Sequence, residues 1–166
     1  MSARAVIDSL EFAVTGGQLH GEAPVAQFER LADSLFDATG ELKYQLTGGC
    51  DARRRPRLQL TVEGAINLRC QRCLGSLTYP VAVESSLLVL AGKVGGETAE
   101  IDDLDGIPAD PHTDVWGLVE DEVLLAIPIA PRHAEGQCNA AVDSAPQRVA
   151  SPFAVLARLK QQRIQN

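Results

Sequence analysis

The sequence predicts a single α+β domain spanning residues 1–166, with an antiparallel β-sheet and three flanking helices. Two runs of alternating apolar residues, at 58–68 and 81–89, lie on either side of a Cys-x-x-Cys pair. That period of two is typical of strands with one buried face. Because the connections between the predicted strands are too short for parallel crossovers, we predict an antiparallel meander that could be barrel-like.

The N-terminal third is predicted to hold a short strand and the first helix. Residues 6–14 alternate briefly and run into Gly16 and Gly17, which indicates a strand or extended arm that ends in a turn. Residues 24–35 predict a helix, because their apolar positions recur at spacings of three and four. Those positions are Val25, Phe28, Leu31, Ala32 and Leu35.

The middle of the chain predicts the sheet. Leu42, Tyr44 and Leu46 alternate as a strand, and a charged turn at residues 51–56 follows. The hairpin formed by the two long alternating runs comes next, with the cysteine pair at its tip. Gly64 interrupts the first of these runs, so we expect a bulge or a close backbone approach there.

The C-terminal half predicts an acidic loop and two more helices. Residues 92–113 are rich in glycine and acid, and we expect them to be mobile or disordered. Asp114 is a suitable N-cap for a second helix that Pro128 ends. Ser151 and Pro152 have the residue types of a cap and first position, and they predict a last short helix.

The charge of the chain is unevenly distributed. The net charge is −7, which argues against broad electrostatic capture of nucleic acid. Residues 43–72, however, contain seven basic and two acidic residues, a local balance of +5, whereas residues 97–122 contain ten acidic residues and no Lys or Arg. One part of the surface could therefore meet RNA while another repels it.

The sequence favours a cytoplasmic protein that does not contact membranes. The N-terminus has no apolar core of signal-peptide length, and there is no 18-residue apolar run. The four cysteines do not form the pattern of a disulfide framework, since two of them are too close in sequence to close a useful loop.

Cys70 and Cys73 have the spacing of half a zinc site. His133 and Cys138 could complete a tetrahedral Cys3His set, leaving out Cys50. The alternative is a pair of reduced thiols that pack a tight turn. We therefore assign no cofactor from the sequence, with zinc as the candidate.

The same pair could instead carry out thiol redox chemistry. Reactive cysteines owe a low pKa to a helix N-terminus or to neighbouring cations. Arg69 and Arg72 supply cations, but residues 74–80 do not have the pattern of a helix. A zinc or thiol enzyme built on Cys70 and Cys73 remains the alternative to a binding protein.

Arginines around the hairpin are the candidates for contact with RNA, because guanidinium groups match the geometry of phosphate. The alternative is a solvated turn whose charge balances the acidic loop. Few aromatic residues are available to stack on bases, so we expect binding of low sequence specificity. The candidates are Arg53, Arg54, Arg55, Arg57, Arg69 and Arg72.

We find no catalytic constellation in the sequence. Glu120, Asp121 and Glu122 occupy consecutive positions of a predicted helix, so their side chains point in different directions and do not converge on one atom. The three histidines are isolated, and no phosphate-binding loop or nucleophile motif occurs.

Three blocks of the sequence resemble the signature blocks of the bacterial YceD family, the large-ribosomal-RNA-subunit accumulation proteins, which also occur in plastids. They are residues 68–74, which include the motif residues Cys70, Arg72, Cys73 and Leu74, residues 119–128, and residues 151–160. The resemblance implies a role in the synthesis, processing or stability of 23S ribosomal RNA, with no catalysed reaction and no small-molecule substrate. The implied partner is a 23S rRNA precursor or, because the chain is acidic, a basic large-subunit ribosomal protein.

Overall fold

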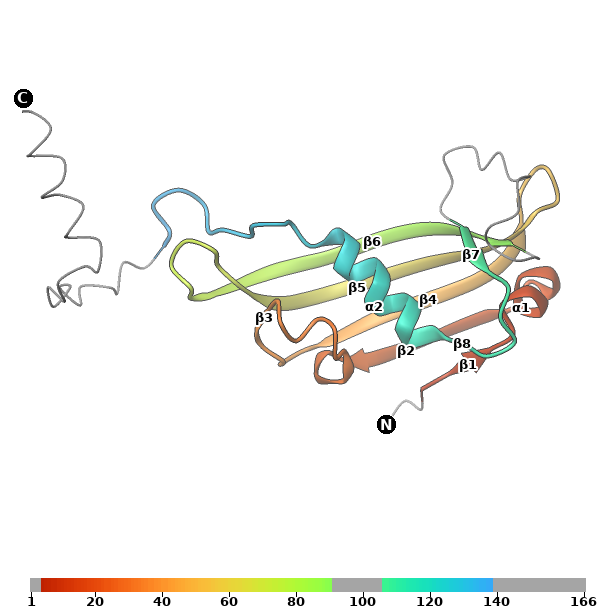
Figure 1. Cartoon of the computed structure of the whole chain (residues 1–166), viewed down its shortest axis with the longest axis horizontal. Coiled ribbons are helices and arrows are strands. Elements are labelled where there is room, and N and C mark those ends of the chain that lie inside the picture. The colour runs from red at the N-terminus through yellow and green to blue at the C-terminus, as the bar shows by residue number, and fades with distance from the viewer. Residues whose placement is uncertain (1–3, 91–105, 139–166) are drawn as a thin grey trace, which may run out of the picture.

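The structure, a computed structural model, describes residues 4–90 and 106–138. A long, twisted β-sheet forms the body of the molecule, and helices lie across one of its faces (Figure 1). The elements in chain order are β1 (Val6–Ile7), α1 (Ser9–Thr15), β2 (Gln18–Pro24), the 3₁₀ turn η1 (Val25–Gln27), β3 (Leu35–Asp37), β4 (Glu41–Cys50), β5 (Pro56–Arg69), β6 (Ser76–Leu90), β7 (Gly106–Pro108), β8 (Thr113–Asp114) and α2 (Val115–Ala126).

The sheet has six strands in the order β2-β4-β5-β6-β7, and β3 also pairs with β5. The pairs β2–β4, β4–β5, β5–β6 and β3–β5 are antiparallel, whereas β6–β7 is parallel. β4 runs along β5 as far as Gly64, and β3 takes over beside Asn67 and Leu68. A separate two-stranded sheet joins β1 to β8.

The predicted hairpin of alternating strands is confirmed as β5 and β6. Their pairing runs without a break from Arg57 opposite Leu88 to Arg69 opposite Ser76. In β5 the even-numbered apolar residues all face the core and are at most 1% exposed, and fully burying such a side chain contributes about 1.5–3 kcal/mol. These residues are Leu58, Leu60, Val62, Ile66 and Leu68.

Gly64 marks a close backbone approach, one of the two alternatives that the sequence predicted for it. Its φ is +152°, and a Cβ atom there would lie 2.9 Å from the carbonyl oxygen of Glu41 and 2.8 Å from the side chain of Leu42. Glycine is therefore the residue that lets the end of β4 pack against the middle of β5.

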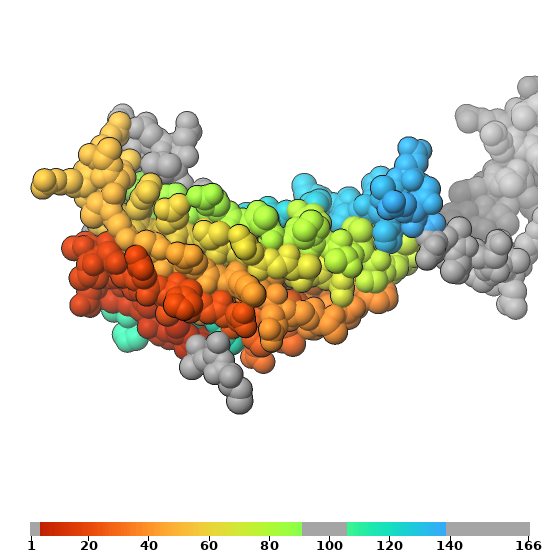
Figure 2. Space-filling view, turned by 180° about the vertical axis from the view of Figure 1, so that it is seen from behind, coloured from red at the N-terminus to blue at the C-terminus, as the bar shows by residue number. Residues whose placement is uncertain are grey.

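The helices cover the apolar face of the sheet and leave the other face open. α2 begins at its predicted cap, where the Asp114 carboxylate accepts a hydrogen bond from the Trp116 N–H, and it buries Val115, Val119 and Val123 in the core. Seen from behind, the strands lie uncovered by α2, which is visible at the margins (Figure 2). The cap and the apolar stripe of this helix were both readable from the sequence.

The predicted helix at residues 24–35 is wrong. Pro24 ends β2, η1 is a single 3₁₀ turn, and the chain reaches β3 through further turns. Val25, Phe28 and Leu31 are nevertheless buried, so the apolar spacing identified core residues without identifying a helix. A distant carboxylate holds these turns: Glu120 Oε1 accepts hydrogen bonds from the backbone N–H groups of Arg30, at 2.7 Å, and Leu31, at 3.1 Å.

The predicted fold class needs correction in three further respects. The described residues contain two α-helices instead of three flanking ones. Only α2 was predicted, because the helix at 24–35 is absent and α1 replaces most of the predicted N-terminal arm. Both sheets are open, so the fold is not a barrel. The parallel pairing of β6 with β7 also departs from a pure meander.

Two predictions fall partly or wholly outside the described residues. The helix predicted to begin at Ser151 lies outside them, as do residues 92–105 of the predicted mobile acidic loop. The last part of that loop, residues 106–113, is described and contains β7 and the start of β8. No described helix is both long and apolar enough to cross a membrane.

Replacing Glu120 with alanine should lower the free energy of unfolding by about 1–3 kcal/mol, because it leaves the buried N–H of Leu31 and the partly buried N–H of Arg30 without an acceptor. Urea denaturation followed by circular dichroism measures the change. Asp121→Ala is the matched control: it removes an ion pair to the same Arg30, but both side chains are about half exposed, so the loss should be much smaller. Equal losses for the two variants would contradict the role assigned to Glu120.

Candidate metal centre and basic surfaces

Cys70 and Cys73 lie in the tight turn that connects β5 to β6. The turn closes through a hydrogen bond from the Cys70 N–H to the Gly75 carbonyl at 3.0 Å, and another from the Leu74 N–H to the Cys70 carbonyl at 2.9 Å. Leu74 adopts a left-handed conformation, with φ at +60°, which lets the chain reverse within these few residues. Backbone hydrogen bonds therefore close the turn, and the cysteine pair lies at the tip of the hairpin as the sequence predicted.

Backbone N–H groups surround the sulfur of Cys70. The Arg72 N–H donates to Cys70 Sγ at 3.5 Å, and the side chain of Cys70 has no exposed surface. The pKa of the Cys70 thiol is lowered to about 5, first by the backbone N–H of Cys73 and then by those of His133 and Arg72, although burial opposes the shift. This arrangement favours the thiolate form, which is the form that ligates metals.

The segment that follows α2 runs back to this tip (Figure 1). The Gln71 N–H donates to the Pro131 carbonyl at 2.8 Å, which ties the segment to the hairpin. A turn then follows, closed by the Gln137 N–H and the Ala134 carbonyl at 3.0 Å. This turn carries Cys138 back beside His133.

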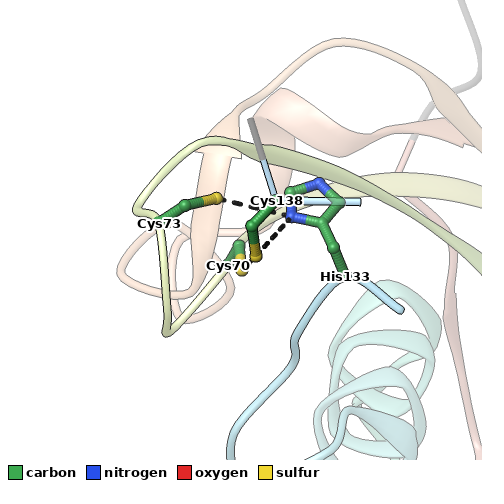
Figure 3. A group of neighbouring side chains, drawn as sticks. All are labelled: Cys70, Cys73, His133 and Cys138. Atoms are coloured by element: carbon green, nitrogen blue, oxygen red, sulfur yellow. Dashed lines mark hydrogen bonds between the residues drawn. The ribbon is translucent and has the colours of Figure 1, made fainter. Parts of the chain in front are cut away.

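The structure brings together the four residues that the sequence singled out as a candidate zinc set (Figure 3). Cys73 Sγ lies 3.4 Å from His133 Nδ1, and Cys138 Sγ lies 3.8 Å from the same nitrogen. Cys70 Sγ and Cys138 Sγ are 3.9 Å apart, and all four ligand atoms lie within 4.8 Å of one another. Cys70, Cys73, His133 and Cys138 therefore form a group that could hold a metal ion.

The remaining cysteine, Cys50, does not belong to this group. It is exposed at the end of β4, and it pairs in register with Pro56 at the start of β5. The cysteine pair follows the other end of β5, so roughly 40 Å of strand separates Cys50 from it.

The same strand, β5, separates in space the arginines that the sequence analysis grouped together. Arg53, Arg54, Arg55 and Arg57 lie in or beside the β4–β5 turn, and Arg69 and Arg72 lie at the β5–β6 tip. The two groups therefore occupy opposite ends of the sheet, and no single compact ligand can touch both.

The β4–β5 turn has an internal scaffold built on Asp51. Its Oδ1 accepts hydrogen bonds from the backbone N–H groups of Arg53 and Arg55, and its Oδ2 pairs with Arg55 Nε at 2.7 Å. The backbone N–H of Arg55 contributes most to holding the pKa of the Asp51 carboxyl below its ordinary value. The turn thereby presents the exposed side chains of Arg53 and Arg54 from a fixed backbone.

The hairpin tip carries a third basic residue that the sequence analysis missed. Arg132 is exposed and lies in the segment that the tip holds, next to His133. A sequence pattern could have identified it: Arg132 directly precedes the candidate ligand His133, just as Arg69 and Arg72 directly precede the two cysteines of the pair.

The three consecutive carboxylates of α2 do not converge, as predicted. Glu120 binds backbone N–H groups near β3, Asp121 pairs with Arg30 Nη2, and Glu122 accepts a hydrogen bond from the Ser85 hydroxyl. Glu120 and Asp121 contact different nitrogens of Arg30, and Glu122 is engaged by Ser85, so the set offers no shared site for acid–base chemistry.

Comparison with known proteins places this arrangement in a family. A family model described as large ribosomal RNA subunit accumulation protein YceD matches residues 58–160. The chain belongs to the YceD family. A relative from Haemophilus influenzae, itself described as large ribosomal RNA subunit accumulation protein YceD, is 29% identical over 152 residues, which cover 81% of this chain and 83% of the relative. No solved structure was found to match the chain.

The family match confirms the resemblance seen in the three sequence blocks. It spans most of β5, all of β6 and α2, and all four residues of the Cys3His group, whereas the β4–β5 turn at residues 51–56 precedes it. The YceD description names accumulation of an RNA and names no reaction.

In the native protein, alkylating reagents should modify Cys50 first and Cys70 last. Cys50 is exposed, whereas the Cys70 sulfur is buried, and the reagent must touch the sulfur whatever its pKa. Mass spectrometry of digested samples taken over time measures the order, and unfolded protein, in which all four cysteines should react, is the control. Modification of Cys70 as fast as Cys50 would contradict the packing of the tip.

Proposed function

We propose that this protein supports the accumulation of 23S ribosomal RNA by binding a large-subunit precursor, without catalysing a reaction. The proposal takes its biological setting from the YceD family, whose description refers to large ribosomal RNA subunit accumulation. The α2 carboxylates are all engaged in structural contacts, which favours a binding role over a catalytic one.

The observation that carries the proposal is the arginine-rich β4–β5 turn. Asp51 holds its backbone, and Arg53, Arg54 and Arg57 add positive charge to the end of an otherwise acidic protein. A fixed turn lowers the entropic cost of aligning guanidinium groups with phosphates. Binding to this turn would be electrostatic, so it should depend on salt and show little preference for sequence.

RNA is favoured over a basic ribosomal protein as the partner of this turn, because like charges would repel such a protein there. A basic protein would instead have to meet acidic surface elsewhere, and the α2 carboxylates Glu120 and Asp121 are already engaged with Arg30. The protein partner remains a distinct outcome of the experiment below.

The thiol redox alternative receives less support from the geometry. The Cys-x-x-Cys turn leads into β6 and not into a helix, so no helix N-terminus begins at Cys70 or Cys73 to activate their thiols. Cys70 is also buried, which keeps it from exchanging with a substrate disulfide.

Changing Arg53, Arg54 and Arg57 together to alanine should weaken binding to transcripts of large-subunit rRNA. The slope of log affinity against log salt concentration should also fall by about one unit for each phosphate that the variant no longer neutralises. Fluorescence anisotropy at salt concentrations between about 50 and 200 mM measures both quantities. Lys43→Ala is the control, because it removes one cation from the open sheet face, where Lys43 already pairs with Glu22.

The same variants test the proposal in cells that lack the gene. The triple arginine variant should fail to restore 23S rRNA, and Lys43→Ala should restore it. RNA binding that is unchanged in the triple variant would contradict RNA contact at this turn. If 23S rRNA then still depended on the gene, the protein partner would be indicated, and a deletion without effect on 23S rRNA would remove the proposal altogether.

A further inference from the structure

We propose that Cys70, Cys73, His133 and Cys138 form a closed tetrahedral zinc site that fastens the β5–β6 tip to the segment following α2. This inference does not rest on the proposed RNA contact, which involves the opposite end of the sheet. It assigns a structural metal to the protein and gives no catalytic role to the ion.

Three of the distances between the four ligand atoms are close to those that zinc imposes. A zinc ion about 2.3 Å from sulfur and about 2.0–2.1 Å from nitrogen sets tetrahedral edges of about 3.8 Å between sulfurs and about 3.6 Å between sulfur and nitrogen. The structure has 3.9 Å between Cys70 Sγ and Cys138 Sγ, and 3.4 and 3.8 Å from His133 Nδ1 to the sulfurs of Cys73 and Cys138. All four ligand atoms lie within 4.8 Å of one another, so side-chain shifts of no more than about 1 Å would close the tetrahedron around an ion.

The histidine is oriented as a ligand through one defined nitrogen. His133 Nε2 lies 2.9 Å from the Ser76 carbonyl oxygen, which can accept a hydrogen bond but cannot donate one. Nε2 must therefore carry the proton, so the neutral ring presents the lone pair of Nδ1 to Cys73 and Cys138. Metal-binding histidines typically have their second nitrogen fixed in this way.

The cysteine ligands have the surroundings of thiolates. The backbone N–H of Arg72 points at Cys70 Sγ, and the turn that supplies it also sets the position of Cys73. Four protein ligands fill a tetrahedral zinc ion, and no position remains for water or substrate. The set of donors therefore fits a structural site and not a catalytic one.

The ion would secure a segment that otherwise has few anchors. Within the described residues, a backbone hydrogen bond from Gln71 to Pro131 holds it to the tip, and the ring of His133 adds the bond to Ser76. Pro131 is buried, but Ile129 is fully exposed and the residues that follow Pro131 are mostly exposed, so the ring of Pro131 is the main apolar contact that offsets the entropy of ordering the segment. Metal ligation would supply the missing free energy.

The surrounding charge also suits this ion. Three thiolates and a neutral imidazole around Zn²⁺ leave a net charge of about −1. Arg69, Arg72 and Arg132, all exposed, each directly precede one of the ligands. The site would thus hold three guanidinium groups together at the tip, and they would compensate its charge.

Metal analysis of the purified full-length protein tests the site. Protein prepared without chelator should contain about one zinc ion per chain. Cys70→Ser and Cys138→Ser should each lose it, and Cys50→Ser is the matched control that should retain it, because Cys50 lies at the other end of β5. Circular dichroism should show that the sheet persists in all three variants, since its core is separate from the site.

Cobalt substitution provides a readout that does not depend on zinc content. Apo-protein titrated with Co²⁺ should develop the intense visible bands of tetrahedral coordination and a sulfur-to-cobalt charge-transfer band, at one equivalent and in the Cys50→Ser variant as well. Three results would each overturn the proposal: weak octahedral cobalt bands, metal content unaffected by Cys138→Ser, or a Cys70–Cys138 disulfide in freshly purified protein.

Discussion

The antiparallel pairing of β5 with β6 is the interaction on which the rest of this structure depends. Its unbroken register buries one face of β5 along the strand, and α1 and α2 pack against this sheet. Because β5 is long, the turns at its two ends are far apart (Figure 1). The β4–β5 turn contains arginines at one end, and the β5–β6 turn contains the cysteine pair at the other. A single strand thus separates two surfaces of different chemistry.

Glu120 shows how one buried carboxylate can accept the backbone hydrogen bonds of a segment that does not form a helix. Its side chain is nearly excluded from solvent, and its cost of burial is offset because Oε1 accepts two backbone hydrogen bonds and Oε2 faces Arg30 Nε at 3.2 Å. The turns between η1 and β3 thereby obtain from α2 the partner that a helix would have found within itself. This contact also fixes α2 against the edge of the sheet, so helix and loop are stabilised together.

The Cys3His group joins the tip of the sheet to the end of the helical layer. α2 ends near β6, where the Tyr79 hydroxyl donates to the Ala126 carbonyl, and the following segment continues along the sheet to the tip. With the ion in place, the hairpin, the helix and that segment would form one rigid unit. The arginines beside the ligands would then have fixed positions, in the same way that Asp51 fixes the arginine turn at the far end.

The features that could be predicted from the amino-acid sequence were local ones. Alternation of period two revealed β5 and β6, an Asp cap followed by apolar spacing revealed α2, and Cys-x-x-Cys revealed half of a ligand set, because each depends on residues close together in the chain. The remaining features depended on contacts between distant segments. The turns found at residues 24–35 are bound by Glu120, some ninety positions away, and the position of His133 and Cys138 beside the cysteine pair depended on how α2 crossed the sheet. Conversely, arginines that are close in sequence are far apart in space, because the two ends of an extended strand of 14 residues lie about 40 Å apart.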